Sequence, residues 1–122
     1  MTFSFTVDST TQIPPFEQLR SQIAAAVRDG RMAAGERLPT VRQLAENAGV
    51  AAGTVARAYR ELEAAGVVET RGRNGTFVSF DADAARGEIQ RAAVAYADLV
   101  RSSSIDPEEG LRIVAAALSR PN

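Results

Sequence analysis

Apolar residues recur with a helical period early in the chain. Four of them follow one another at intervals of three or four residues: Phe16, Leu19, Ile23 and Val27. This spacing places them on one face of a helix, which can then be buried. Pro14-Pro15 precedes the series, and proline suits the first helical turn because no needed N–H is lost. Asp29-Gly30 follows it, and glycine favours the left-handed conformation that ends a helix. We therefore predict a first helix between these two signals.

Two more stretches with helical periodicity follow, separated by a short turn. Thr40 and Gln43 have the spacing of a capping box, in which each side chain satisfies a free backbone group at a helix start. The apolar pattern then predicts helices at about residues 41–48 and 52–65, each followed by a glycine. The positions expected to be buried are Val41, Leu44, Ala45 and Ala48 on the first of these helices, and Val55, Ala58, Tyr59 and Leu62 on the second.

Two β-prone runs come next, at residues 67–70 and 76–80. The loop between them, residues 71–75, contains Asn74-Gly75, and Asn-Gly between apolar runs is a strong hairpin signal. A helix, a tight turn, a helix and a hairpin in this order form a winged helix-turn-helix. Such a motif binds DNA by placing its second helix in the major groove.

The first residues alternate apolar and polar side chains. Phe3, Phe5 and Val7 fall on one face, which predicts a short strand or an extended arm. Residues 8–11, Asp-Ser-Thr-Thr, are typical of a turn.

The last forty or so residues predict two helices. Asp81 or Asp83 can cap one that ends near Arg101, and Asp106-Pro107 begins the other. Helices of about 19 and 13 residues are unstable alone, so they must pack on the first domain or on a second copy of the chain. We predict that they pair two copies, through Ile89, Ala93, Tyr96, Val100, Leu111, Val114 and Leu118. The predicted fold class is mainly α with a small β-hairpin: a winged helix-turn-helix domain at residues 1–80 and a two-helix dimerisation tail at residues 81–122.

Composition removes most enzymatic chemistry. The chain has neither Cys nor His, so disulfides, thiolate chemistry, most transition-metal sites and the commonest general base are absent. Asp106, Glu108 and Glu109 lie at the predicted start of the last helix, where acidic side chains are favoured by the helix dipole, so they do not indicate an acid/base site. We therefore expect no enzyme, no metal and no cofactor. No run approaches the roughly 18 apolar residues of a membrane span, and no signal peptide is recognisable, so we expect a cytoplasmic protein that does not bind membranes.

For DNA binding, the net charge of the chain is less informative than the positions of its arginines. The formal net charge is −1, which counts against a strongly basic nucleic-acid binder. Attraction to phosphates is local, however, on the scale of a Debye length of about 8 Å. Gly53, Arg57 and Arg60 lie opposite the buried stripe of the second motif helix, and two arginines lie in the hairpin loop. The predicted DNA-binding residues are Thr40, Arg42, Ala51, Ala52, Gly53, Thr54, Arg57, Arg60, Arg71, Arg73, Asn74, Gly75 and Thr76.

Several of these residues have a second interpretation. Arg57 is suited to guanine or to a phosphate, but it can instead pair with Glu61, four residues on. Arg60 can likewise pair with Glu63. Tyr59 and Phe77 are expected to be core residues rather than base-stacking ones.

Four stretches resemble the bacterial GntR family of transcriptional regulators: P-F-E-Q-L-R-S-Q-I (15–23), G-E-R-L-P-T-V-R-Q-L-A (35–45), G-V-A-A-G-T-V-A-R-A-Y-R-E-L-E-A-A-G (49–66) and R-G-R-N-G-T-F-V (71–78). The A-Y-R-E-L step and the short tail resemble the YtrA-like subfamily in particular. The resemblance implies a homodimeric repressor of operons, often operons for ABC transporters, with a small dimerising tail and no large effector domain.

The recognition helix departs from the family pattern. Ala51 stands where the family often has Asn, Ser or Thr, and Ala52 and Gly53 replace polar residues. Loss of the N-cap side chain costs about 1 kcal/mol. Specificity is then expected to depend on Arg42, Arg57, backbone amides and the wing.

Two alternatives remain at the level of sequence. One is a winged helix that binds a protein partner and no DNA. The other is a regulator that senses a small-molecule effector between tail and core, or in a cleft between two protomers.

Overall fold

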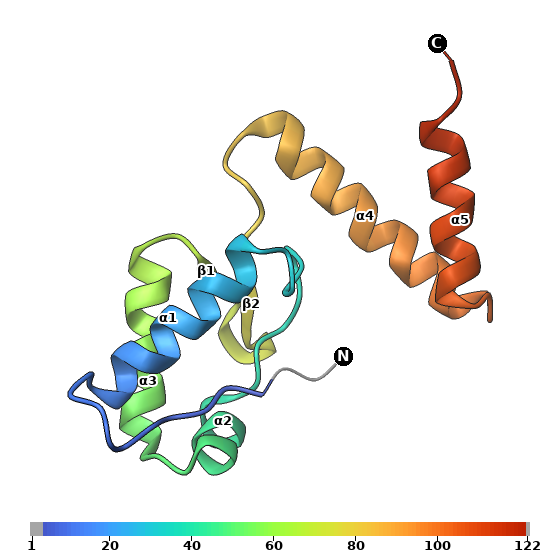
Figure 1. Cartoon of the computed structure of the whole chain (residues 1–122). Helices are drawn as coiled ribbons and strands as arrows, with labels where there is room; N and C mark the ends of the chain where they lie inside the picture. The colour runs from blue at the N-terminus through green and yellow to red at the C-terminus, as the bar shows by residue number, and fades with distance from the viewer. Residues whose placement is uncertain (1–3, 122) are drawn as a thin grey trace. The chain divides into compact units, whose positions relative to one another are not determined.

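The computed structural model describes residues 4–121, which divide into two compact units at Phe80 and Asp81 (Figure 1). The first unit contains α1 (Pro15–Arg28), α2 (Val41–Ala48), α3 (Ala52–Ala64), β1 (Val68–Thr70), the short 3₁₀ helix η1 (Gly72–Asn74) and β2 (Thr76–Val78). The second contains α4 (Ala84–Ser102) and α5 (Pro107–Leu118). The predicted fold class, mainly helical with a two-stranded wing and two C-terminal helices, is confirmed. Among the described helices, none is long and apolar enough to cross a bilayer.

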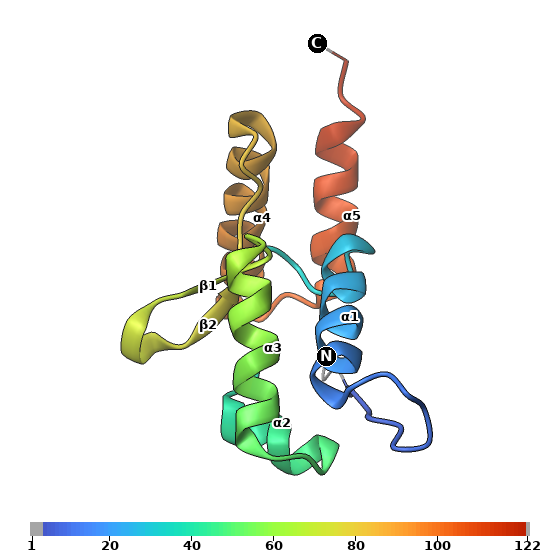
Figure 2. The same cartoon turned by 90° about the vertical axis from the view of Figure 1, so that its left-hand side faces the viewer.

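Helix α1 begins and ends where the sequence predicts. Pro15 occupies its first position, and Gly30, with φ +77°, follows its C-cap residue Asp29. Leu19 and Ile23 of the apolar stripe are fully buried. The stripe packs against α3, which lies beside α1 in both views (Figures 1 and 2).

The capping box at the start of α2 is present as predicted. The Thr40 hydroxyl accepts the Gln43 N–H, and the Gln43 side chain accepts the Thr40 N–H. Gly49 ends α2 in the left-handed conformation, with φ +70°. The tight turn that follows brings α3 against α2 (Figure 2).

The wing is an antiparallel hairpin. Its register pairs Val68 with Val78, Glu69 with Phe77 and Thr70 with Thr76. Arg37, from the segment before α2, adds an isolated bridge to Phe77. Val68 and Val78 are buried, because residues directly opposite each other in a hairpin lie on the same face and this face meets the core.

One core joins these elements. It is formed by Phe5, Leu19, Ile23, Ala26, Met32, Leu38, Leu44, Ala45, Val55, Ala58, Tyr59, Leu62, Val68 and Val78. Every residue predicted to be buried on α3 belongs to it. On α2, Leu44 and Ala45 are buried, and Val41 and Ala48 pack against its edge.

The N-terminal segment is an extended arm, without strand structure in residues 4–8. Two glutamines of α1 bind its backbone in the way a neighbouring strand would. Gln22 accepts the Thr6 N–H and donates to the Thr6 carbonyl, and Gln18 does the same at Asp8. The arm's polar groups are thus satisfied without a sheet, while Phe5 is buried. Phe3 lies outside the described residues.

The second unit is a pair of helices with very little core. Asp83, one of the two predicted caps, accepts the Arg86 N–H at the start of α4, and Asp106 caps α5. Among described residues 81–121, only Gly87, Val100 and Gly110 are buried. Val100 and Gly110 are in close contact, since a Cβ at Gly110 would lie 3.0 Å from both Val100 methyl carbons.

Candidate nucleic-acid interface

The outer face of α3 is exposed on the surface of the helix-turn-helix. Gly53, Arg57, Arg60 and Ala64 are all exposed there, opposite the four buried residues of the same helix. Tyr59, on the buried side, donates a hydrogen bond to the Pro39 carbonyl at 2.7 Å. Burial raises the pKa of Tyr59, so the phenol stays protonated and remains a donor. This bond ties α3 to the segment before α2, and Tyr59 is a core residue, as predicted.

No side chain caps the N-terminus of α3. Ala51 is the N-cap residue, with φ −69° and ψ 149°, and it offers no oxygen to the first backbone amides. Ala51, Ala52 and Gly53 are exposed, and Thr54 is half-buried. The first N–H groups of a helix point outward and carry the positive end of its dipole, which suits a phosphate oxygen.

The start of α2 carries two predicted site residues with different environments. Thr40 is exposed, and its hydroxyl accepts the Gln43 N–H in the capping box, which leaves its O–H able to donate. Arg42 is exposed and forms no ion pair with any residue in 4–121. Both side chains therefore keep hydrogen-bond donors on the surface, and the Arg42 side chain is the longer and the charged one.

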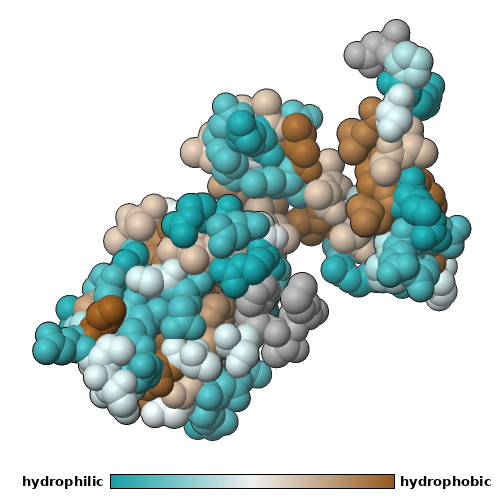
Figure 3. All heavy atoms as spheres, in the orientation of Figure 1, coloured by the Kyte–Doolittle hydropathy of each residue, from teal (hydrophilic) through white to brown (hydrophobic). Residues whose placement is uncertain are grey.

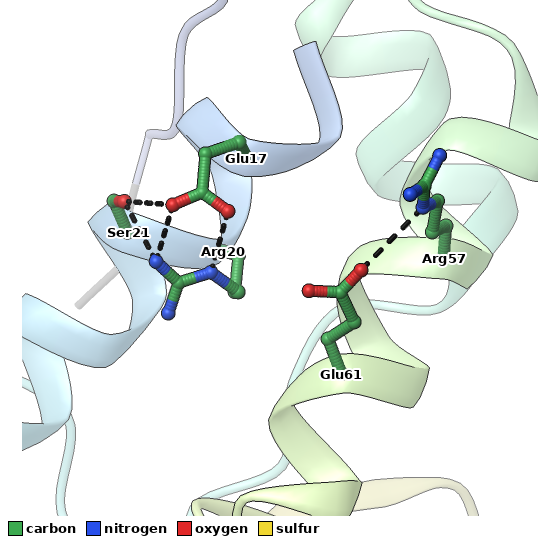
Figure 4. Close-up of polar contacts among 5 residues, drawn as sticks. All are labelled: Glu17, Arg20, Ser21, Arg57 and Glu61. Carbon is green, nitrogen blue, oxygen red and sulfur yellow. Dashed lines mark hydrogen bonds and ion pairs between the residues drawn. The ribbon is translucent and has the colours of Figure 1, made fainter. Parts of the chain in front are cut away.

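Arg57 makes two contacts within the protein, and Figure 4 shows the one with Glu61. Its Nε lies 3.4 Å from Glu61 Oε2, and its Cζ lies 3.7 Å above the centre of the Phe16 ring. The pair with Glu61 is the alternative that the sequence left open, and it forms here. Arg60, by contrast, forms no ion pair with Glu63 in the described chain.

The wing holds the remaining predicted residues. Arg71 pairs with Glu69 at 2.8 Å and lies over the half-buried Phe77 ring at 4.2 Å. Arg73, in η1 at the loop, is exposed and has no ion-pair partner in residues 4–121. Asn74 is also exposed, whereas Gly75 and Thr76 are half-buried. In Figure 2 the hairpin projects to one side of α3.

Arg37 belongs to this surface, although the sequence did not indicate it. A Cβ at Gly75 would lie 2.9 Å from Arg37 Nε, so the guanidinium rests against the wing loop. Its place depends on the bridge between Arg37 and Phe77, which joins segments about forty residues apart. No periodic pattern in the sequence encodes such a long-range pairing.

The predicted dimer residues divide into two groups. Ile89, Leu111 and Leu118 are 69%, 68% and 82% exposed, and Ala93 is exposed as well. Tyr96, Val100 and Val114 are covered to different degrees. Tyr96 donates to the Gly110 carbonyl and Val100 contacts Gly110, so both hold α4 to α5 within one chain. Leu99 and Ile113 are further exposed apolar residues that the prediction did not include, and Figure 3 shows apolar side chains gathered along α5.

The described residues contain no group of three acidic side chains placed to hold a metal ion. The predicted DNA-binding residues supply arginines, backbone amides and small side chains.

The chain matches the family described as "Bacterial regulatory proteins, gntR family" over residues 15–78. It belongs to the GntR family. The matched region runs from the first residue of α1 to the last residue of β2, so it covers the helix-turn-helix and the wing. The chain is thus a DNA-binding transcriptional regulator and not an enzyme.

Individual GntR-family relatives support the same assignment. The chain is 51% identical over 108 residues to the HTH-type transcriptional regulator Rv1152 of Mycobacterium tuberculosis, and the match covers 87% of each chain. It is 37% identical over 76 residues to the HTH-type transcriptional repressor YtrA of Bacillus subtilis, covering 62% of this chain and 58% of that one. This agrees with the YtrA-like resemblance.

A solved structure shows a similar domain on DNA. AraR(DBD), in complex with operator ORE1, matches with a TM-score of 0.54 and 25% identity, over 63% of this chain and 94% of that one. In that protein, a domain of this fold was solved with its operator.

Proposed function

We propose that this GntR regulator is a repressor that binds a near-palindromic operator as a homodimer. The observation that carries the proposal is the surface of α3. It exposes Arg57, Arg60 and an uncapped N-terminus on the side opposite the core. A recognition helix needs such a face to enter the major groove.

The roles that we propose for the DNA-binding residues follow from their environments. Backbone amides at Ala51, Ala52 and Gly53 are suited to a phosphate, because no side chain within residues 4–121 caps this helix end. Arg42 and Arg57 are suited to phosphates or guanine edges. The wing residues Arg71, Arg73, Asn74, Gly75 and Thr76, with Thr40, Thr54 and Arg60, complete the proposed contact set.

The proposed division of labour follows the two compact units. Residues 1–80 bind DNA, and residues 81–122 join two copies. The second unit supports this role because it buries almost nothing of its own, while Ile89, Leu111 and Leu118 remain exposed. Two short helices with so few buried residues need a further surface to be stable.

Repression is proposed from the likeness to YtrA, which is named a repressor. Because the partner is chromosomal DNA, the proposed place of action is the bacterial cytoplasm. Two recognition helices related by a two-fold axis would then enter major grooves roughly 34–36 Å apart.

Selection of bound duplexes from a random pool tests the proposal. The expected result is an enriched, near-palindromic sequence whose half-sites are one helical turn apart. Binding should weaken steeply as salt rises, because arginines that neutralise phosphates release counterions. If no sequence is enriched and binding to DNA is absent at low salt, the protein is a winged-helix interaction module instead.

A further inference from the structure

The guanidinium of Arg57 has two contacts in the free protein, with the Phe16 ring and with the Glu61 carboxylate, and Figure 4 shows the second of them. Phe16, at the start of α1, lies under its face, with 3.7 Å between Cζ and the ring centre. Glu61, one turn along α3, accepts at its Nε edge. A stacked face and a bound edge together restrict both the position and the rotation of the group.

The contact with Glu61 uses only the Nε of Arg57 and does not involve its two terminal amino groups. A guanidinium has five N–H donors, of which Nε supplies one. No other hydrogen bond or ion pair of Arg57 occurs within residues 4–121. The two terminal amino groups therefore keep their donors, and this forked edge is the one that binds two phosphate oxygens, or O6 and N7 of guanine.

Glu61 is available for this role because the neighbouring cation is occupied. Arg20 on α1 has a favourable electrostatic interaction with Glu61, but its hydrogen bonds go elsewhere. It donates from Nε to Glu17 Oε1 at 2.8 Å, from Nη2 to Glu17 Oε2, and to the Ser21 hydroxyl at 3.3 Å. Figure 4 shows these two separate sets of contacts, one on α1 and one on α3.

We propose that Glu61 is a positioning residue for DNA recognition. It binds the Nε edge of Arg57 above the Phe16 ring and holds the terminal amino groups ready for two acceptors on DNA. The proposal rests on the proposed function, and in particular on Arg57 as a DNA contact. An arginine ordered before binding loses less conformational entropy when it binds.

The direction in which DNA affinity changes when Glu61 is removed distinguishes a positioning role from a purely electrostatic one. A carboxylate beside a DNA-binding face repels phosphates, so its removal should tighten binding if charge alone matters. If Glu61 positions Arg57, its removal should weaken specific binding. Glu63 provides a matched control, because it lies on the same helix, carries the same charge and forms no ion pair in the described chain.

The experiment measures the affinity of the full-length chain for a duplex that the wild type has selected from a random pool, and for a scrambled duplex. Glu61→Ala should weaken binding to the selected duplex by about three- to tenfold, the effect expected from freeing one long side chain. Glu63→Ala should change it by less than about twofold. Glu61→Gln should recover most of the loss, because an amide oxygen still accepts from Nε.

A double-mutant cycle makes the assignment specific. In the Arg57→Ala background, Glu61→Ala should have no further effect. The proposal is overturned if Glu61→Ala binds as tightly as Glu63→Ala, or if its loss is the same without Arg57. If Arg57→Ala itself binds like the wild type, the proposed DNA contact fails first, and the two failures are therefore distinguishable. Thermal unfolding checks that each variant is folded.

Discussion

At the scale of single residues, the arginines of the proposed interface differ in whether they contact other side chains of the protein. Arg42 and Arg73 are exposed without ion-pair partners in the described chain, whereas Arg57 and Arg71 each contact a carboxylate and an aromatic ring. Exposed ion pairs contribute little to stability, so these contacts add little to the free energy of unfolding. What they change is the orientation of the guanidinium before binding.

Replacing Arg57 tests whether it contacts DNA. Arg57→Ala should weaken specific binding by about 1–3 kcal/mol if the side chain binds a base edge or a phosphate. The measurement is a titration of the selected duplex. Arg28→Ala removes the same charge from the exposed C-terminal end of α1 and serves as the control. Equal losses for the two variants would contradict a specific contact by Arg57.

The N-cap position of α3, where Ala51 provides no side-chain acceptor, leads to a prediction about stability. Ala51→Ser introduces a hydroxyl that can accept an N–H of the first turn, so it should raise the free energy of unfolding by about 1 kcal/mol. Ala51 already has the extended backbone of an N-cap residue. Ala52→Ser adds the same hydroxyl one position later, inside the helix, where it should not stabilise. Urea denaturation compares the two variants, and equal stabilities would contradict the capping argument.

At the scale of elements, the wing depends on one glycine and one long-range bridge. Gly75 has φ +111° and ψ −164°, a conformation that is essentially restricted to glycine. The Arg37 guanidinium lies against the same residue. The loop is therefore shaped both by its own backbone and by a side chain from before α2.

Replacing Gly75 should distort the wing. Gly75→Ala is expected to lower the free energy of unfolding by about 1–3 kcal/mol, because a side chain is strained in this conformation. Affinity for the selected duplex should fall with it if the wing contacts DNA. Asn74→Ala, at the neighbouring position with an ordinary backbone, should leave stability within about 0.5 kcal/mol. A Gly75→Ala variant as stable as Asn74→Ala would show that the loop relaxes without cost.

At the scale of the whole molecule, the two units differ in how much they bury. The first has a continuous core that joins the arm, three helices and the wing. The second buries Val100 against Gly110 and little more among its described residues, and leaves several large apolar side chains in water. This contrast supports a first unit that is stable in itself and a second that is completed by another copy of the chain.

Light scattering tests the dimer directly. The wild type should have twice the mass of one chain at micromolar concentration, and Ile89→Glu should shift it toward the monomer and weaken binding to the selected duplex. The expected cause is a charge placed at a buried contact between copies. Ile13→Glu makes the same change at an exposed position of the first unit and should leave the mass unchanged. A monomeric wild type would overturn the dimer proposal.

The sequence by itself determined the local structure of this protein. The capping box at Thr40 and Gln43, the proline that begins α1 and the buried stripe of α3 all act within one or two helical turns, and each was found where predicted. Such signals are visible in the sequence because their partners are three or four residues away.

Only the tertiary structure decided how distant segments use their side chains. Gln18 and Gln22 bind the arm, Arg37 reaches the wing loop, and Tyr96 joins α4 to α5. The pattern of apolar positions contains none of these contacts, because each joins polar groups across a turn or from separate elements. For the same reason the sequence left Arg57 with two interpretations. The structure shows that Arg57 pairs with Glu61 on its own helix. The packing of α1 on α3 also places Phe16 beneath the Arg57 guanidinium, a contact that the sequence pattern does not reveal.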